Sequence, residues 1–354
     1  MTASRASRLR ALAGLAVVLV TVTGCNSFAS IKPEASATRT TTAAPTTTPP
    51  PPPPVWPLTG VPTTALVNRP ALAVKIENSI DARPQTGLND ADMVWEEVVE
   101  GGITRFVAVY NSTIPTEIGP VRSVRPMDPS IAVPLHGVLA FSGGATWILN
   151  IVKQSGVQML SQDAGNDGFY RTRTRSAPHN VYATPQTLLS QADPARAVSP
   201  PPAQFQFAPT GGQPTVATAG TPATSLKMTI SAVSHPTWTW SAADGKWLRS
   251  ENTTPSVNSD GARLAATNVV VVRVDVVLLN AFDPAGNRVP ETQLVGTGAA
   301  LVASGGKTMT ATWTKTAVDK PLVLTDASGN PVDLAPGNTW VELVPKTTGP
   351  LTVG

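Results

Sequence analysis

The chain has 354 residues with a single cysteine, and it carries 26 Lys and Arg residues against 23 Asp and Glu residues. Residues 1–24 hold three of the basic residues and none of the acidic ones, so the chain after them has 23 residues of each sign. This balance excludes a general electrostatic affinity for nucleic acid, and the lone cysteine excludes an intramolecular disulfide.

Residues 1–24 have the features of a secretory signal peptide. Three arginines precede an apolar run over residues 11–22. The run is shorter than the roughly 20 residues that a membrane-spanning helix needs. It ends in Val-Thr-Gly-Cys25, which resembles a bacterial lipobox. This pattern predicts that Cys25 carries a lipid such as palmitate and anchors the protein on the extracytoplasmic face of the cell membrane. An ordinary signal peptide that leaves a free thiol is the alternative.

Residues 25–54 consist largely of Ser, Thr, Ala and Pro and end in six consecutive prolines. A segment of this composition cannot bury a core, so we expect a disordered, extended tether. At roughly 3 Å per residue, it would reach about 80 to 90 Å from the membrane. The proline run is alternatively a recognition motif for a partner.

The remaining residues, from Val55 onward, suffice for two ordinary domains. Clusters of Pro and Gly interrupt all periodicity between Asp193 and Ser225, and Phe205 and Phe207 alternate there as in one short strand. We therefore expect an N-terminal domain at 55–192, a linker at 193–225, a C-terminal domain at 226–346 and a tail at 347–354.

The N-terminal half mixes strands and helices. Two runs rich in β-formers flank Gly101-Gly102 and predict a hairpin, and Thr184-Pro185 is typical of a helix start. This half is therefore expected to be an α+β or mixed α/β domain. The expected elements are strands at 71–76, 94–99, 103–110 and 138–141, and helices at 145–154 and from residue 185.

The C-terminal half reads as nearly all β. Asp244-Gly245 and Gly305-Gly306 are turn signals between apolar runs, and residues 268–279 form a long run rich in valine. Many short strands with short turns predict a sandwich or barrel-like domain. The expected strands are 238–241, 247–249, 268–279, 299–303, 308–313, 322–324 and 339–344.

Ten short motifs give the chain a resemblance to the YerB-like lipoproteins, a bacterial family with N- and C-terminal domains of unknown function. The resemblance covers residues 57 to 345 and implies a lipid-anchored, two-domain protein without specifying its biochemistry. The motifs are PLTG at Pro57, IENS at Ile76, ARPQTGL at Ala82, ADMVWE at Ala91, EGGITRF at Glu100, IGPVRSVRP at Ile118, PHNVY at Pro178, NVVV at Asn268, GTGAA at Gly296 and PGNTWV at Pro336.

The segment between Pro120 and Pro126 is the most suggestive of a binding site. The two prolines favour an extended backbone that displays Arg122, Ser123 and Arg125. Together with Arg105 on the neighbouring strand, these arginines could bind a carboxylate or phosphate. The alternative is that they pair internally, with partners among Glu96, Glu97, Glu100 and Asp128.

A second candidate segment follows at residues 171–182. Arg171, Arg173 and Arg175 alternate with Thr, so an extended chain would place them on one face, either as a solvated basic strand or as an extension of the anion site. Next come three potential ligand-binding residues, His179, Asn180 and Tyr182. His179 is also a candidate acid or base, although a purely structural histidine fits the pattern as well.

The remaining motifs do not indicate a specific ligand or reaction. Ser142-Gly143-Gly144 between a strand and a helix could offer backbone N–H groups to an anion but fits a tight turn as well. The sequence lacks the metal-binding and nucleophile motifs of common hydrolases, so we expect no metal and no cofactor. Glu97 or Glu100 with His179 remains a candidate catalytic pair.

The sequence therefore predicts a non-catalytic, lipid-anchored binding protein. Its expected partner, besides the membrane contacted through the lipid on Cys25, is an anionic or peptide-bearing cell-wall polymer or an envelope protein. A cell-envelope hydrolase or transferase and a structural scaffold are the two alternatives.

Overall fold

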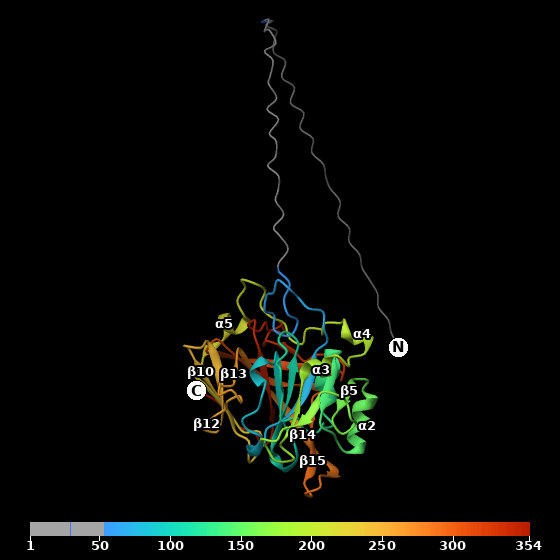
Figure 1. Cartoon of the computed structure of the whole chain (residues 1–354). Helices are drawn as coiled ribbons and strands as arrows, with labels where there is room; N and C mark the ends of the chain where they lie inside the picture. Colours follow the sequence, from blue (N-terminus) through green and yellow to red (C-terminus); the bar gives the residue numbers. More distant parts are fainter. Residues whose placement is uncertain (1–28, 30–52) are drawn as a thin grey trace, which may run out of the picture. The chain divides into compact units, whose positions relative to one another are not determined.

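The computed structural model describes residue 29 and residues 53–354 (Figure 1). The predicted signal peptide, Cys25 and nearly all of the predicted tether lie outside this range. No helix among the described residues is long and apolar enough to cross a membrane.

Short helices and strands alternate in the first half of the described chain. The strands are β1 (Leu72–Glu77), β2 (Met93–Val98), β3 (Thr104–Tyr110), β4 (Val138–Phe141), β5 (Gln158–Ser161), β6 (Phe169–Arg171) and β7 (Val181–Ala183). The helices are α1 (Asp128–Ala132), α2 (Thr146–Gln154), α3 (Pro185–Leu189), α4 (Pro194–Ala197) and α5 (Thr215–Ala219), with 3-10 turns η1 (Ile80–Ala82), η2 (Leu88–Asp90), η3 (Glu100–Gly102) and η4 (Val133–Leu135).

Strands dominate the second half, which confirms its predicted β-rich character. They are β8 (Thr221–Pro222), β9 (Ser225–Met228), β10 (Pro236–Ser241), β11 (Lys246–Glu251), β12 (Thr254–Pro255), β13 (Ala265–Ala266), β14 (Asn268–Phe282), β15 (Arg288–Gln293), β16 (Gly296–Ser304), β17 (Lys307–Lys315), β18 (Val323–Thr325), β19 (Thr339–Pro345) and β20 (Leu351–Val353). The hairpin of β14 and β15 extends beyond the other strands (Figure 1).

Twelve strands form the main sheet, in the order β18-β17-β16-β14-β19-β2-β3-β1-β4-β5, with β15 beside β14 and β8 beside β17. Strand β19 lies between β14 and β2 and is parallel to both. Strands from both halves of the chain thus share one sheet, and the proposed boundary at 193–225 does not divide it. The two-domain division of the sequence stays a prediction.

The strands at the centre of this sheet are buried on both faces, as their nearly continuous apolar sequences require. We call the two sides face A and face B. Face A carries Trp95, Val107 and Val341 and is covered by apolar residues of α1, α2 and α5. Face B carries Phe106, Val271 and Trp340 and is covered mainly by a second sheet.

The second sheet has six strands, ordered β12-β11-β10-β9-β20 with β13 beside β11. Its Trp238 meets Trp340 of β19 edge to face at 5.2 Å between ring centroids, and Trp340 meets Phe106 of β3 at 5.3 Å. These large buried rings join the two sheets. The C-terminal strands are therefore shared between two sheets.

Two sequence predictions about local structure are wrong. Phe207 forms only an isolated bridge with Leu334 and lies in no strand, since the pairing does not extend beyond this bridge, and Phe205 stacks on Trp95 at 6.4 Å. Strand β6 ends at Arg171 and bends follow, so Arg171, Arg173 and Arg175 do not share an extended run. Arg175 instead donates hydrogen bonds to the carbonyl oxygens of Asp81 and Pro84.

Candidate functional site

Charged residues gather where β1 and β2 end and β3 begins. In the register of these strands Glu77 faces Arg105, and Arg105 faces Glu97. Because side chains alternate along a strand, these three lie on face A, whereas Glu96 and Thr104 lie on face B. The charged group on face A, the Glu77 cluster, comprises Lys75, Glu77, Glu97, Glu100, Arg105, Arg122, Arg125, Asp128 and His179.

The innermost part of the Glu77 cluster is a buried lysine between two acids. Lys75 Nζ contacts Glu97 Oε1 and lies 2.7 Å from Asp128 Oδ1, and all three side chains are inaccessible to solvent. Burial raises the pKa of Glu97 to about 8 against the attraction of Lys75. Glu97, a candidate catalytic residue, is therefore held in the interior by Lys75.

Arg125 and Glu100 form the next pair. Arg125 Nε and Nη2 lie 2.7 and 2.6 Å from Glu100 Oε2, and the Arg125 backbone N–H donates to Asp128 Oδ2 at 2.6 Å. Both side chains are buried. Arg125 is thus paired internally, which was the alternative to a role in ligand binding. Glu100 is not in contact with His179, with which the sequence had suggested a catalytic pair.

Arg105 has no such partner. Its side chain is 4 % exposed and donates through Nη1 to the carbonyl oxygen of Ser123 at 2.7 Å. Among residues 53–354 no carboxylate lies within ion-pair distance of it, and its Nε has no hydrogen-bond partner. Burial, and then the charges of Arg125 and Arg122, lower the pKa of Arg105 to about 9.

The outer part of the cluster reaches solvent through Arg122 and His179. Glu77 is buried, and its Oε1 lies 2.9 Å from His179 Nδ1, 2.8 Å from Ser79 Oγ and 3.4 Å from Arg122 Nε. The side chains of Arg122 and His179 are 21 % and 23 % exposed. His179 is therefore oriented by Glu77, and not by either acid proposed from the sequence.

The remaining predicted ligand-binding residues hold the surrounding loops. Asn180 Oδ1 accepts a hydrogen bond from Arg171 at 2.8 Å. Tyr182 packs on Gly119, where an added Cβ would lie 2.6 Å from the ring, so this position needs glycine. Ser123 Oγ lies 3.4 Å from Ser142 Oγ. The structure brings Arg105, Arg122, Arg125 and His179 together and leaves Asn180 and Tyr182 in supporting positions.

The loop at Ser142-Gly143-Gly144 ends β4, beside the ends of the parallel strands β1 and β5. The carboxylate of Asp163 fills the space next to Gly143, where an added Cβ would lie 1.8 Å from Asp163 Oδ2. A negative charge in this position disfavours the anion-binding interpretation of the loop.

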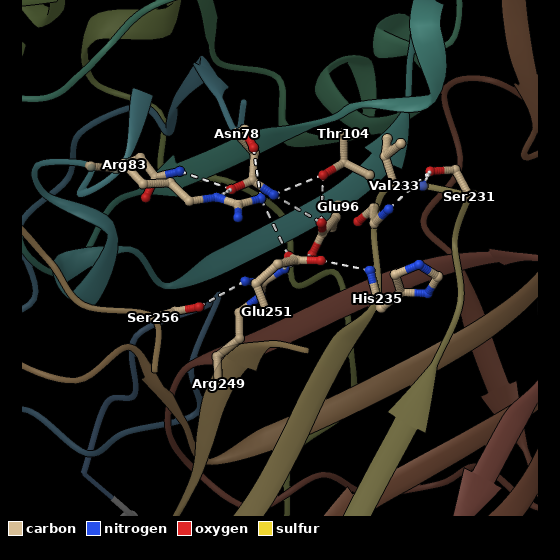
Figure 2. Close-up of polar contacts among 12 residues, drawn as sticks. Asn78, Arg83, Glu96, Thr104, Ser231, Val233, His235, Arg249, Glu251 and Ser256 are labelled. Carbon is tan, nitrogen blue, oxygen red and sulfur yellow. Dashed lines mark hydrogen bonds and ion pairs between the residues drawn. The ribbon is translucent and has the colours of Figure 1, made fainter. Parts of the chain in front are cut away.

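A second charged group lies on face B, and sequence reasoning missed it. Glu96 accepts hydrogen bonds from Thr104 at 2.6 Å and from Asn78 at 3.1 Å, and Arg249 Nη2 lies 2.7 Å from it (Figure 2). Arg249 belongs to β11 of the second sheet and is itself buried. This group, the Glu96 cluster, comprises Asn78, Arg83, Glu96, Thr104, Arg249, Glu251 and Glu342.

The Glu96 cluster contains two acids side by side. Glu342 of β19 pairs in register with Glu96 of β2 and accepts a hydrogen bond from Trp238 at 2.8 Å. Burial, and then the neighbouring Glu96, raise the pKa of Glu342 well above its ordinary value. A sequence signal existed: Trp247, Arg249 and Glu251 alternate along β11, so Arg249 must point the same way as a core tryptophan.

Across the described residues no group of His, Cys, Asp and Glu has the arrangement of a metal site. The geometry of face A can instead orient a histidine and present guanidinium groups to a ligand.

Comparison with known proteins places the chain in a family. Residues 58–198 match the N-terminal domain of a protein family of unknown function, DUF3048, and residues 226–341 match its C-terminal domain. "Putative lipoprotein YerB" of Bacillus subtilis (strain 168) is 35% identical over 142 residues, which are 39% of this chain and 42% of that protein. The aligned part is thus less than half of the YerB sequence.

The fold is also that of a solved structure. A crystal structure of YerB protein from Bacillus subtilis matches with a TM-score of 0.70 at 22% sequence identity, over 84% of this chain and 99% of that one. The likeness shows that the two proteins share their fold. With both family domains matched in order, the chain belongs to the DUF3048 family, the YerB-like proteins, whose function is unknown.

Proposed function

We propose that this protein is an envelope lipoprotein that binds an anionic group of a cell-wall component or protein partner at the open side of the Glu77 cluster. The observation that carries the proposal is Arg105, a buried guanidinium without a carboxylate partner among the described residues. Lys75 and Arg125 are matched by Asp128 and Glu100. Because Arg105 has no such partner, an additional negative charge supplied by a ligand is favoured near it.

The ligand would enter at Arg122. Its Nη1 makes one long contact of 3.5 Å with the carbonyl oxygen of Pro178, so the terminal nitrogens are available to solvent. A carboxylate or phosphate can accept two parallel hydrogen bonds from such a group. His179 beside it would donate a further hydrogen bond, and Arg105 would add attraction from beneath without direct contact.

We place the protein on the extracytoplasmic face of the membrane, held by the lipid on Cys25. The lipobox-like sequence and the similarity to a protein described as a lipoprotein support this placement. A Cys25→Ala chain should then appear in the soluble fraction after export. Its persistence on membranes would contradict the lipid anchor.

The binding proposal is tested by a pull-down of residues 53–354 with purified cell-wall sacculi. Arg122→Gln should remove one or two charge-assisted hydrogen bonds, each worth about 1.5–3 kcal/mol, and so most of the binding. Arg288→Gln is the matched control, because Arg288 is exposed and donates only to the backbone of Leu278 and Leu279. Equal retention of both variants would exclude a specific anion site.

A scaffold role predicts a different result. If Arg122 served only to fix the fold, Arg122→Gln should lower the unfolding midpoint without any ligand being involved. Circular dichroism of the wild type and the variant separates this outcome from a loss of binding in a folded protein.

One observation favours a hydrolase as the second candidate. Glu77 holds His179 at 2.9 Å, which is the arrangement that orients a histidine as a general base. Fragments released from sacculi by the wild type, and not by His179→Gln or Glu77→Gln, would favour this function. Saturable binding without released product would count against it.

A further inference from the structure

Strand β14 continues past the end of its neighbour β19. The register of these two parallel strands ends where Val274 lies beside Pro345, whereas β14 runs on to Phe282. Over this last part β14 pairs only with β15, so one of its edges has no neighbouring strand within residues 53–354 (Figure 1). We call this free edge, from Val276 to Phe282, the β14 edge.

The main-chain polar groups of the β14 edge can be assigned from the register. Lys346 donates its backbone N–H to the carbonyl oxygen of Val274 at 2.8 Å, so the polar groups of Val274 point toward β19. Because this direction alternates along a strand, those of Val276 and Leu278 point the same way, beyond the end of β19. Arg288 donates to the carbonyl oxygen of Leu278. The N–H and C=O of Val276 and the N–H of Leu278 are therefore left for a further strand.

The β14 edge also lacks the residues that usually protect a free strand edge from pairing. Such edges commonly carry charged side chains or proline. The other strand of the hairpin has both, in Arg288, Pro290 and Glu291, whereas residues 276–282 contain neither. Leu278, in the middle of the edge, is about half exposed. The sequence of β14 therefore favours the addition of a strand here.

A groove of about 860 Å³ lies beside the β14 edge. Val276 and Leu278 line it from β14, Val98 from the end of β2, and Pro345 from the end of β19. Residues 229–232, which follow β9 of the second sheet, also line it. The groove thus lies where β19 ends, next to the two strands that flank β19 in the main sheet.

The groove is largely apolar. Among the described residues that line it, Arg288 alone is charged, and its guanidinium donates to the carbonyl oxygens of Leu278 and Leu279. Glu100 of the Glu77 cluster belongs to η3, which borders the groove, but its carboxylate is bonded to Arg125. The groove therefore favours a neutral occupant with apolar side chains.

We propose that the β14 edge binds an extended, uncharged segment of a protein partner as an additional strand. The main chain of this segment would exchange hydrogen bonds with Val276 and Leu278, and every second side chain would enter the groove. A compact ligand could occupy the groove but could not use the main-chain groups along the edge. The site is separate from the proposed anion site, because neither Arg122 nor His179 lines it.

The test uses the full chain in lipid nanodiscs, labelled at the methyl groups of isoleucine and leucine and observed by NMR. The probe is an uncharged peptide of alternating threonine and valine, acetyl-Thr-Val-Thr-Val-Thr amide. At saturation it should shift the signals of Leu278 and Ile230, which line the groove. The signal of Ile151, which lies on α2, should not change.

Two N-methylated copies of the probe test for strand pairing. One is methylated at the nitrogens of its second and fourth residues, the other at those of its third and fifth. Because the N–H groups of a strand point alternately to its two edges, only one copy loses the hydrogen bonds to β14. That copy should bind at least about tenfold more weakly, and the other should bind nearly as the parent peptide does.

A pair of variants tests the position of the site. Leu278→Lys places a charge on the β14 edge and beside the groove, and it should weaken binding of the probe about tenfold or more. Val277→Lys is the matched control, because Val277 is 46 % exposed against 52 % for Leu278 but does not line the groove. Both side chains are about half exposed, so both variants should fold, and the control should bind as the wild type does.

Three results would overturn the proposal. They are unchanged Leu278 and Ile230 signals at saturating probe, equal affinity of the two methylated copies, and equal affinity of Leu278→Lys and Val277→Lys. A dimer in analytical ultracentrifugation that only Leu278→Lys converts to a monomer would assign the edge to a second copy of this chain, and would also overturn it. Arg122→Gln should bind the probe as the wild type does, so a failure of the anion site and a failure of the β14 edge can be told apart.

Discussion

The Glu77 and Glu96 clusters arise from neighbouring residues of the same strands but differ in how their charges are matched. In the Glu96 cluster Arg249 lies between Glu96 and Glu251, beneath a second sheet. In the Glu77 cluster the buried Arg105 has no carboxylate partner among the described residues, and Arg122 and His179 are partly exposed. From this difference we propose that the Glu96 cluster fixes the packing of the two sheets, whereas the Glu77 cluster binds the ligand.

The largest expected effect comes from replacing Arg249, the central residue of the Glu96 cluster. Arg249→Met leaves Glu96 and Glu251 without their shared partner, which should lower the free energy of unfolding by about 3–5 kcal/mol. Urea unfolding measures the change, with Arg288→Met as the exposed control. A loss comparable to that of the control would mean that the Glu96 cluster is not needed for packing.

In the Glu77 cluster a substitution should affect binding more than stability. Arg122→Gln should change the free energy of unfolding by less than about 1 kcal/mol, since the side chain is partly exposed, while binding to sacculi weakens by about 1.5–3 kcal/mol. Parallel unfolding and binding titrations compare the two quantities. A variant that loses stability but keeps its affinity would reverse the comparison.

Glu97, in the interior of the Glu77 cluster, should make the stability of the protein depend on pH. The pKa of Glu97 is about 8 in the folded protein against an ordinary value of 4.5, so the folded state binds more protons than the unfolded state between these two pH values. Stability should therefore fall as pH rises from about 5 to 8, by at most about 1.4 kcal/mol per pH unit. Urea midpoints of Glu97→Gln should fall less over this range; parallel slopes would show that Glu97 is not responsible.

The smallest effect on stability is expected from replacing Glu342 of the Glu96 cluster. Burial, and then the neighbouring Glu96, raise the pKa of Glu342 and so favour its uncharged form, which glutamine resembles in shape. Glu342→Gln should therefore change stability by about 0.5 kcal/mol or less. Glu96→Gln removes the partner of Arg249 and should cost more. Thermal unfolding of the two variants checks the order, and equal costs would mean that both acids are charged.

Local signals in the sequence predicted much of the sheet. The hairpin of β2 and β3 follows from the runs around Gly101-Gly102, and β14 from its valine-rich sequence. These elements depend on neighbours along the chain, which alternation and turn residues reveal. The segment around Arg122 could be identified in the same way, because Pro120 and Pro126 flank it in the sequence.

The partners of the site residues could not be predicted in the same way. Glu77 and His179 are 102 residues apart, and Arg249 and Glu96 are 153 apart. Alternation shows which residues of one strand share a face, but not which distant element covers that face. Sequence reasoning therefore assigned Glu97 and Glu100 to His179, although Lys75 and Arg125 bind them.

The position of β19 has a consequence for the order of folding. β2 pairs with it residue for residue, Met93 with Thr339 and Glu96 with Glu342, so one edge of β2 stays open until the chain beyond residue 338 is present. Pairings this distant in sequence are slow to form, and open strand edges promote aggregation. A chain emerging from its N-terminus must therefore keep the Met93–Val98 edge unpaired through most of its synthesis.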